Sequence, residues 1–284
     1  MKRRSLLGML GAAGVGGAAA VTAAAAGANT EGHRLYGHSW DHDAERANNA
    51  GLGNGEHRRI GSGRIVWSVD TTERVVALTF DDGPDPALTS RVLDELDAAS
   101  ASATFMMMGW NAHTNRALAL DVEAAGHEIG SHGWSHLDLA QCSPEQVTTE
   151  LTKGKAAIEA VTRAPVRWFR PARGVLTGHA IRVATELGHD IAMWSLTAAV
   201  SDRQSSDRVG RQVVDNAGPG DIVCLHDGLG RGTFARESKT ASKLLRRRTA
   251  ELDALGPLLN ALSARDFRFV TLSELEALDG GSSR

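Results

Sequence analysis

The 284-residue sequence has few cysteines and little net charge. Its two cysteines, Cys142 and Cys224, allow at most one disulfide bond. Cys224 lies inside the apolar run 222–225, where a small buried side chain is the commoner role, although an oxidising compartment would allow the pair to form. The formal net charge of −3 makes nucleic acid an unexpected partner. With 42% hydrophobic and 23% charged residues, the chain is neither disordered nor membrane-spanning throughout.

The N-terminal stretch has no acidic residue before Glu31. Basic residues at positions 2–4 precede an Ala- and Gly-rich apolar run at 6–26, which predicts a signal peptide over residues 1–28. The paired arginines favour twin-arginine export. An uncleaved anchor is the alternative, but so much Ala and Gly makes a weak membrane helix. We therefore expect a protein that is secreted, extracellular or associated with the cell wall, without a stable membrane span after cleavage.

The rest of the chain predicts one domain between two short flanking segments. Residues 29–63 have no sustained periodicity and read as a flexible linker, and residues 280–284 form a tail. Within 64–279, short apolar strands alternate with amphipathic helices, and we find no internal repeat. The fold class predicted is α/β: a distorted (β/α) barrel of about seven parallel strands, similar to a TIM barrel. Residues 65–69 and 75–80 are expected to form a hairpin at its start.

The domain is organised around the stretch 75–86, V-V-A-L-T-F-D-D-G-P-D-P. Its apolar run predicts a strand that is buried on both faces, so Asp81 and Asp82 stand at its carboxyl end. That end is where ligands bind in parallel α/β folds. Neighbouring side chains of an extended segment point to opposite sides, so one aspartate can bind a metal while the other acts as a base. A simple turn is the alternative, since Asp-Asp-Gly-Pro is good turn chemistry.

Two histidines, His132 and His136, follow the strand predicted at 127–130. If the turn between them is helical, four-residue spacing puts both imidazoles on one face, within reach of one ion. Together with an aspartate they supply two nitrogens and one oxygen, and they leave coordination positions open for water and substrate. Such a set indicates a catalytic divalent metal, with zinc as the default and cobalt, nickel or iron as alternatives.

Two further strand ends carry chemically useful side chains. Arg170 follows the strand at 166–169, where its guanidinium can hold the non-ligand aspartate ionised and oriented; the alternative is a surface ion pair. His226 ends the strand at 221–225, where it can donate a proton to a leaving group.

These motifs resemble those of the polysaccharide deacetylases of carbohydrate esterase family four. The first family motif is matched in full by 79–84 (T-F-D-D-G-P) and the second by 131–136 (S-H-G-W-S-H), and the resemblance runs from about residue 65 to 278. It implies that Asp81 is the general base, that Arg170 orients it, and that His226 is the general acid. It also implies one divalent ion bound by Asp82, His132 and His136.

The chain departs from the family pattern at four positions. The third motif has Ala172 and Arg173 where Pro-Tyr is usual, and the resemblance implies that the backbone N–H of Arg173 helps to bind the oxyanion. Thr197 replaces the aspartate that tunes the acid histidine, and a neutral hydroxyl cannot stabilise imidazolium as a carboxylate does. Cys224 stands where an aliphatic residue is usual.

Trp134 and Trp194 lie near strand ends, where they would stack on sugar rings or pack in the core.

From these observations we expect a secreted, monomeric, metal-dependent deacetylase that removes N-acetyl, or O-acetyl, groups from a glycan such as peptidoglycan or chito-oligosaccharide. A non-catalytic glycan-binding relative is the alternative, because of Thr197. An iron oxygenase is the second alternative, because two histidines and one carboxylate also form the iron site of such enzymes. The basic run 231–248 would favour an anionic cell-wall polymer or form a solvated loop.

Overall fold

The computed structural model describes residues 63–198, 205–230 and 238–279. The predicted signal peptide, all but the last residue of the predicted linker, and the predicted tail lie outside these ranges. Within them, no helix is both long enough and apolar enough to cross a membrane.

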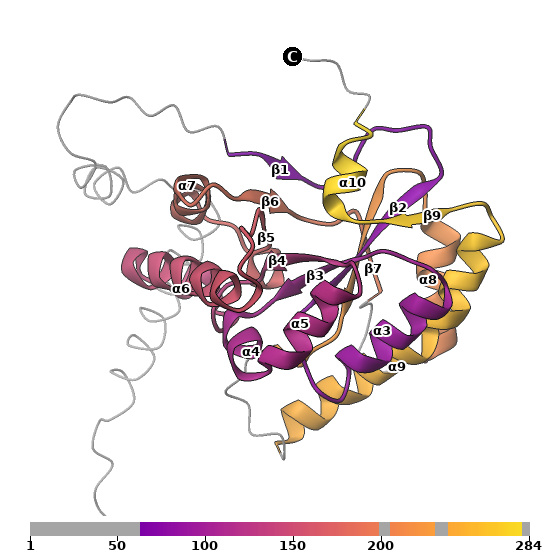
Figure 1. The fold of residues 1–284 in the computed structure, drawn as a ribbon, viewed down its shortest axis with the longest axis horizontal. Coiled ribbons are helices and arrows are strands. Elements are labelled where there is room, and N and C mark those ends of the chain that lie inside the picture. The colour runs from indigo at the N-terminus through magenta and orange to yellow at the C-terminus, as the bar shows by residue number, and fades with distance from the viewer. Residues whose placement is uncertain (1–62, 199–204, 231–237, 280–284) are drawn as a thin grey trace, which may run out of the picture. The chain divides into compact units, whose positions relative to one another are not determined.

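One curved parallel sheet forms the centre of the domain, with helices around it (Figure 1). In space the strands follow the order β1-β6-β5-β4-β3-β2-β8-β7, and β9 also pairs with β2. All ladder pairings are parallel, which confirms the predicted α/β barrel-like fold, although β1 and β7 end the order as edges among the described residues. The strands are β1 (Ile65–Val66), β2 (Val75–Asp81), β3 (Thr104–Met107), β4 (Glu128–Ser131), β5 (Trp168–Phe169), β6 (Asp190–Ala192), β7 (Leu196–Thr197), β8 (Asp221–His226) and β9 (Arg268–Val270).

Strand β2 is the central strand, and all seven of its residues are buried. It pairs with β3 and β9 as well as with β8, whose register sets Asp81 opposite His226. Its side chains alternate between two hydrophobic clusters: Val76, Leu78 and Phe80 pack in one, and Val75 and Ala77 in the other. The alternation puts Asp81 on the same face as Ala77.

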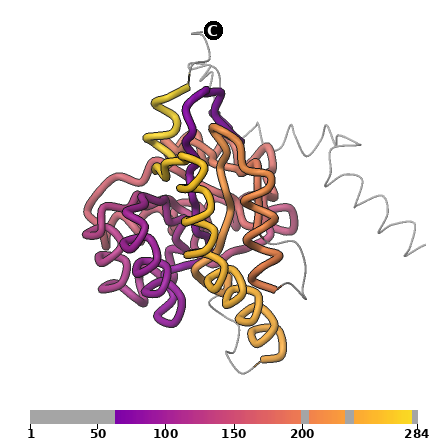
Figure 2. The backbone as a smooth tube through the Cα atoms, turned by 90° about the vertical axis from the view of Figure 1, so that its right-hand side faces the viewer, coloured from indigo at the N-terminus to yellow at the C-terminus, as the bar shows by residue number. Residues whose placement is uncertain are grey.

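The helices connect the strands and cover the outside of the sheet. Figure 2 shows helices α8 (Ser206–Asn216) and α9 (Lys239–Ser263) running side by side along one flank. Helix α6 begins with a capping box at Ser143, and α9 is capped by the side chain of Ser238. The helices are α3 (Thr89–Ala98), α4 (Gly109–Thr114), α5 (Arg116–Ala124), α6 (Pro144–Thr162), α7 (Gly178–Glu186), α8 (Ser206–Asn216), α9 (Lys239–Ser263) and α10 (Leu272–Glu276), with 3₁₀ turns η1 (Leu139–Gln141) and η2 (Ala172–Gly174).

The predicted hairpin at the start of the domain is wrong. Strand β1 pairs in parallel with β6 at the far edge of the sheet, and Ile65 lies opposite Ile191. The chain then passes the amino end of β8, where Val69 N–H donates to the carbonyl of Gly220 at 2.9 Å, before it enters β2. Strand β2 has no free edge for a hairpin partner, since β8 lies on one side and β9 and β3 follow one another along the other.

Candidate active site

The two adjacent aspartates point to different neighbours because the backbone turns sharply between them. Asp81 is the last residue of β2. Asp82 has a φ of 77°, a left-handed conformation, and the following Gly83–Pro84 bond is cis. Because of the positive φ of Asp82, the extended strand ends at Asp81. The two carboxylates therefore point in different directions because of this turn, and not only because side chains alternate along a strand.

Asp82, His132 and His136 form a buried cluster with the chemistry of a metal centre. Asp82 Oδ1 lies 3.6 Å from His132 Nε2 and 3.4 Å from His136 Nε2. This oxygen is buried and has no hydrogen-bond partner among the described residues. One ligand atom from each of the three residues lies within 4.8 Å of the other two. An orphaned carboxylate oxygen facing two imidazole nitrogens fits a divalent cation.

The tautomer of His132 suits this role. Its Nδ1 lies 2.8 Å from the carbonyl oxygen of Arg170, which can only accept, so Nδ1 carries the hydrogen and Nε2 keeps its lone pair for a ligand. For His136, burial lowers the pKa below its ordinary value and outweighs the attraction of Asp82, which favours the neutral, metal-binding form.

The loop between the histidines is not the helical turn that the spacing suggested. Gly133 and His136 have φ values of 77° and 62°, and the two imidazole rings converge with centroids 5.2 Å apart. Glu150 of α6 holds the loop: its carboxylate accepts from the backbone N–H of Ser135 at 2.6 Å and from that of Leu137 at 3.3 Å. The loop is thus fixed from outside the sheet by a buried carboxylate.

Close backbone packing supports the same loop. Gly154 of α6 lies against Gly133, so a Cβ added at Gly154 would stand 2.5 Å from the Gly133 carbonyl carbon. A Cβ added at Gly109, the first residue of α4, would stand 2.8 Å from the Cα of Gly154. Three glycines therefore let α4, α6 and the histidine loop approach one another more closely than side chains would permit.

Asp81 is held by Arg170, whose side chain is fully buried. Arg170 Nη1 donates to Asp81 Oδ1 and to Thr79 Oγ1, both at 2.7 Å. Its Nε and Nη2 donate to the carbonyls of Ala192 at 3.0 Å and Met193 at 2.8 Å. Burial alone would raise the pKa of Asp81, but the Arg170 charge and the nearby histidines hold it below its ordinary value. Asp81 is therefore an ionised carboxylate in a fixed orientation.

Cys224 touches the other oxygen of this carboxylate. Its S–H donates to Asp81 Oδ2 at 3.5 Å, a contact that the sequence did not reveal. Asp81, Cys224 and His226 together also have metal-ligand chemistry. We discount them as a metal centre because Arg170 occupies Asp81 Oδ1, and because burial and the charge of Asp81 raise the pKa of the Cys224 thiol well above its usual range. No disulfide bond joins Cys142 to Cys224.

Helix α9 contributes a buried cation that the sequence analysis missed. Arg248, the last residue of the basic run, donates from Nη2 to Asp82 Oδ2 at 2.9 Å. Burial would raise the pKa of Asp82, but His136, Arg248 and His132 lower it to about 2. Arg248 thus holds one oxygen of Asp82 and leaves the other facing the histidines.

His226 contacts the carboxylate of Glu251, which the sequence analysis missed. Its Nδ1 lies 2.9 Å from Oε2 of Glu251, also on α9. Thr197 lies opposite Cys224 in the β7–β8 ladder, and its hydroxyl donates weakly to the Cys224 carbonyl at 3.5 Å. The pattern of residues 249–264 predicts a helix that includes Glu251, but nothing in the sequence indicates that its side chain contacts His226.

Each predicted substrate-binding side chain contacts another side chain of the protein. Arg173 has a φ of 57°, and its largely exposed side chain pairs with Asp138 at 3.6 Å. Trp134 packs edge-on against Trp110, with ring centroids 5.5 Å apart. Trp194 lies over the Arg170 guanidinium, 5.6 Å from ring centroid to Cζ. The structure thus places these side chains and leaves their contact with a sugar as a prediction.

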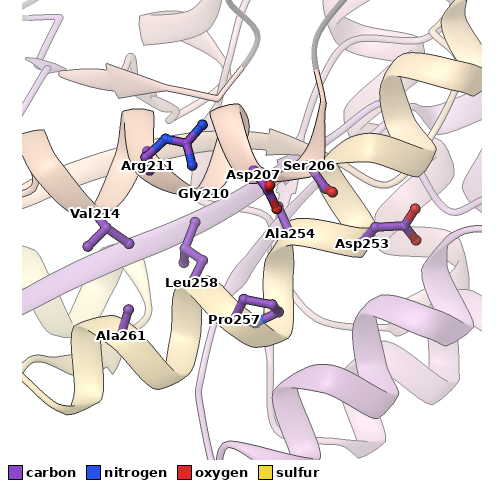
Figure 3. Close-up of a pocket in the computed structure, with 10 residues that line it drawn as sticks. All are labelled: Ser206, Asp207, Gly210, Arg211, Val214, Asp253, Ala254, Pro257, Leu258 and Ala261. Atoms are coloured by element: carbon purple, nitrogen blue, oxygen red, sulfur yellow. The ribbon is translucent and has the colours of Figure 1, made fainter.

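A surface groove between α8 and α9 lies apart from this chemistry (Figure 3). Pro257 and Leu258 of α9 face Val214 of α8 across it. None of its lining residues belongs to either cluster of metal-ligand type, so we assign it no part in the reaction.

The ends of parallel strands bring together an Asp-His-His cluster, a held carboxylate and a histidine, a combination that hydrolysis assisted by a divalent metal can use. The sequence model of the polysaccharide deacetylase family matches residues 68–192. The chain is 35% identical over 216 residues to a peptidoglycan-N-acetylglucosamine deacetylase of Bacillus cereus, covering 75% of this chain and 93% of the relative. It is 34% identical over 203 residues to a chitooligosaccharide deacetylase of Bradyrhizobium, covering 71% and 90%.

Among solved structures, the Bc1960 peptidoglycan N-acetylglucosamine deacetylase superposes with a TM-score of 0.66 at 27% identity, covering 75% of this chain and 92% of that one. The chain belongs to the polysaccharide deacetylase family, whose members are hydrolases acting on amide bonds of acetylated glycans. The family match at 68–192 includes the metal cluster, Asp81 and Arg170, but it ends before β8 and α9. His226 and its neighbours must therefore be judged from the geometry.

Proposed function

We propose that this protein is an exported deacetylase that hydrolyses N-acetyl groups of a glycan such as peptidoglycan or chito-oligosaccharide with the help of one divalent metal ion. The observation that carries the proposal is the orphaned Oδ1 of Asp82 between the two imidazoles, directly beside the ionised carboxylate of Asp81.

Asp82, His132 and His136 would hold the ion, through Oδ1 of the aspartate and a nitrogen of each histidine. A cation bound there supplies Lewis-acid polarisation of the acetyl carbonyl and lowers the pKa of a bound water. Zinc suits one oxygen and two nitrogens, and cobalt or nickel accept the same ligands.

The chain's own residues divide the proton transfers between them. Asp81, kept ionised by Arg170, accepts the proton of the attacking water. His226 lies opposite Asp81 in the strand register and donates a proton to the amine nitrogen as the C–N bond breaks. The products are acetate and a free amino sugar.

The substrate and the location are supported from outside the site. The relatives named above act on peptidoglycan and on chitooligosaccharide. The basic and apolar pattern of residues 1–28 supports export to the compartment in which such glycans occur.

Acetate release tests the proposal. Protein freed of metal with a chelator is assayed with zinc, cobalt or nickel on acetylated chito-oligosaccharide, peptidoglycan and acetylated xylan. We expect release that requires metal. Asp81→Asn should keep its metal and lose about 10²–10⁴-fold in kcat, whereas Asp94→Asn, the same change at an exposed position of α3, should retain the parent rate.

The non-catalytic glycan-binding alternative predicts a different result: binding of these polymers without acetate release under any metal. Undiminished turnover by Asp81→Asn would refute the assignment of the base.

A further inference from the structure

We propose that Glu251 of α9 is the positioning residue of His226, and that it supplies the carboxylate that position 197 of this chain lacks. The inference rests on the proposed function, because it concerns the histidine that protonates the leaving amine. It adds a residue from an element that lies outside the family match.

The contact is short and buried. Glu251 Oε2 lies 2.9 Å from His226 Nδ1, and the two side chains are 4% and 14% exposed. An ionised carboxylate only accepts, so Nδ1–H of His226 donates to it. The imidazole is then fixed with Nε2 on its other side as the nitrogen that delivers the proton.

Glu251 is itself held in place by its neighbour one helical turn earlier. Arg248 Nη1 donates to Glu251 Oε1 at 3.2 Å, and Arg248 Nε donates to the carbonyl of Gly228 at 3.0 Å. Burial would raise the pKa of Glu251, but the charge and hydrogen bond of His226, followed by those of Arg248, lower it below its ordinary value. Glu251 is therefore ionised, and both of its oxygens have a partner.

The other charged or titratable groups near His226 do not fill this place. Asp81 of β2 is bound by Arg170, and Cys224 of β8 donates to Asp81. Arg248 of α9 is a cation. Asp82 binds Arg248 and faces the metal-ligating histidines.

From the sequence, Asp202 or Asp227 could take this role instead, and Asp202 lies outside the described residues. Asp227 accepts from Thr89 Oγ1 at 2.7 Å, and burial raises its pKa to about 7. Thr197 carries no charge, and its hydroxyl donates to the Cys224 carbonyl at 3.5 Å. The geometry therefore assigns the carboxylate role to Glu251.

The test is Glu251→Gln, which keeps the shape and removes the charge. With Glu251 in this role, kcat/KM falls about 10–100-fold, and the alkaline limb of its pH profile moves to lower pH by about one unit or more, because less of the acid is protonated at a given pH. Metal content stays at the parent level. Asp253→Asn, the same change at an exposed position of α9, leaves rate and profile unchanged. Glu251→Asp, which retains the charge, recovers the parent's alkaline limb in part.

A second measurement uses the parent protein and does not depend on how the variants fold. In the ¹⁵N NMR spectrum of neutral His226, we expect the hydrogen on Nδ1. A neutral His226 protonated on Nε2, or a Glu251→Gln profile that superposes on the parent's, overturns the inference. A parent without acetate release refutes the proposed function instead, while the tautomer measurement still decides whether Glu251 holds His226.

Discussion

The buried ion pair of Arg170 and Asp81 should contribute strongly to the stability of the domain. Arg170→Met replaces the guanidinium by an apolar side chain of similar length. It leaves the Asp81 carboxylate buried without its cation, and it removes the donors to the carbonyls of Ala192 and Met193.

The magnitude follows from the contacts. Removing one partner of a buried ion pair costs about 3–5 kcal/mol, because the other charge stays buried. Each orphaned carbonyl adds about 1 kcal/mol or more. We therefore expect Arg170→Met to lose at least about 5 kcal/mol of unfolding free energy at neutral pH, and less in acid, where Asp81 becomes protonated. Losses of that size approach the total stability of many domains.

Urea unfolding in the presence of a chelator measures these losses of unfolding free energy in the metal-free protein. Asp81→Asn in the Arg170→Met background removes the stranded charge but restores no hydrogen bond to the carbonyls. It should therefore recover about 3 kcal/mol, or restore a folded protein if the single variant does not fold. A coupling energy below about 1 kcal/mol in this double-mutant cycle would show that Asp81 does not depend on Arg170, and the argument for a held, ionised base would fail.

Three further predictions concern the surroundings of this pair. His132→Ala should abolish stoichiometric metal binding in elemental analysis while circular dichroism stays near that of the parent; full occupancy would mean that the ligands are wrongly assigned. Gly154→Ala should lower both the melting temperature and the metal affinity, because its Cβ would displace Gly133. An unchanged metal affinity would show that the packing of α6 against Gly133 does not determine the position of the histidine loop. Asp227→Asn should stabilise the metal-free protein by an amount that grows from about pH 4 to about pH 7, since burial raises the folded-state pKa of Asp227 to about 7, so that over this range the carboxyl ionises in the unfolded chain but stays protonated in the folded protein. A stability difference independent of pH would contradict that pKa.

Sequence reasoning succeeded where the signal was local. The apolar run before Asp81 predicted a buried central strand, and β2 is one. Strand ends predicted where Asp82, His132 and Arg170 would meet, and the structure brings their elements together. The division of roles among them stays a prediction until the variants are assayed.

Prediction from the sequence failed for contacts between residues that are far apart in the chain. Helix α9 begins at Lys239, ten residues before the start predicted for it, because the basic run has no apolar periodicity to mark a helix. Arg248 and Glu251 therefore looked like surface charges. Only the crossing of α9 over the ends of β2 and β8 turns them inward, and no spacing in the sequence encodes that crossing.

The hydrogen bond between His226 and Glu251 also bears on how such sites diverge. A histidine at a strand end can take its carboxylate partner from a neighbouring strand or from a helix, so Thr197 does not by itself leave His226 without one. A search of related sequences that requires an aspartate at this strand position would therefore overlook chains in which a helix carboxylate faces the histidine.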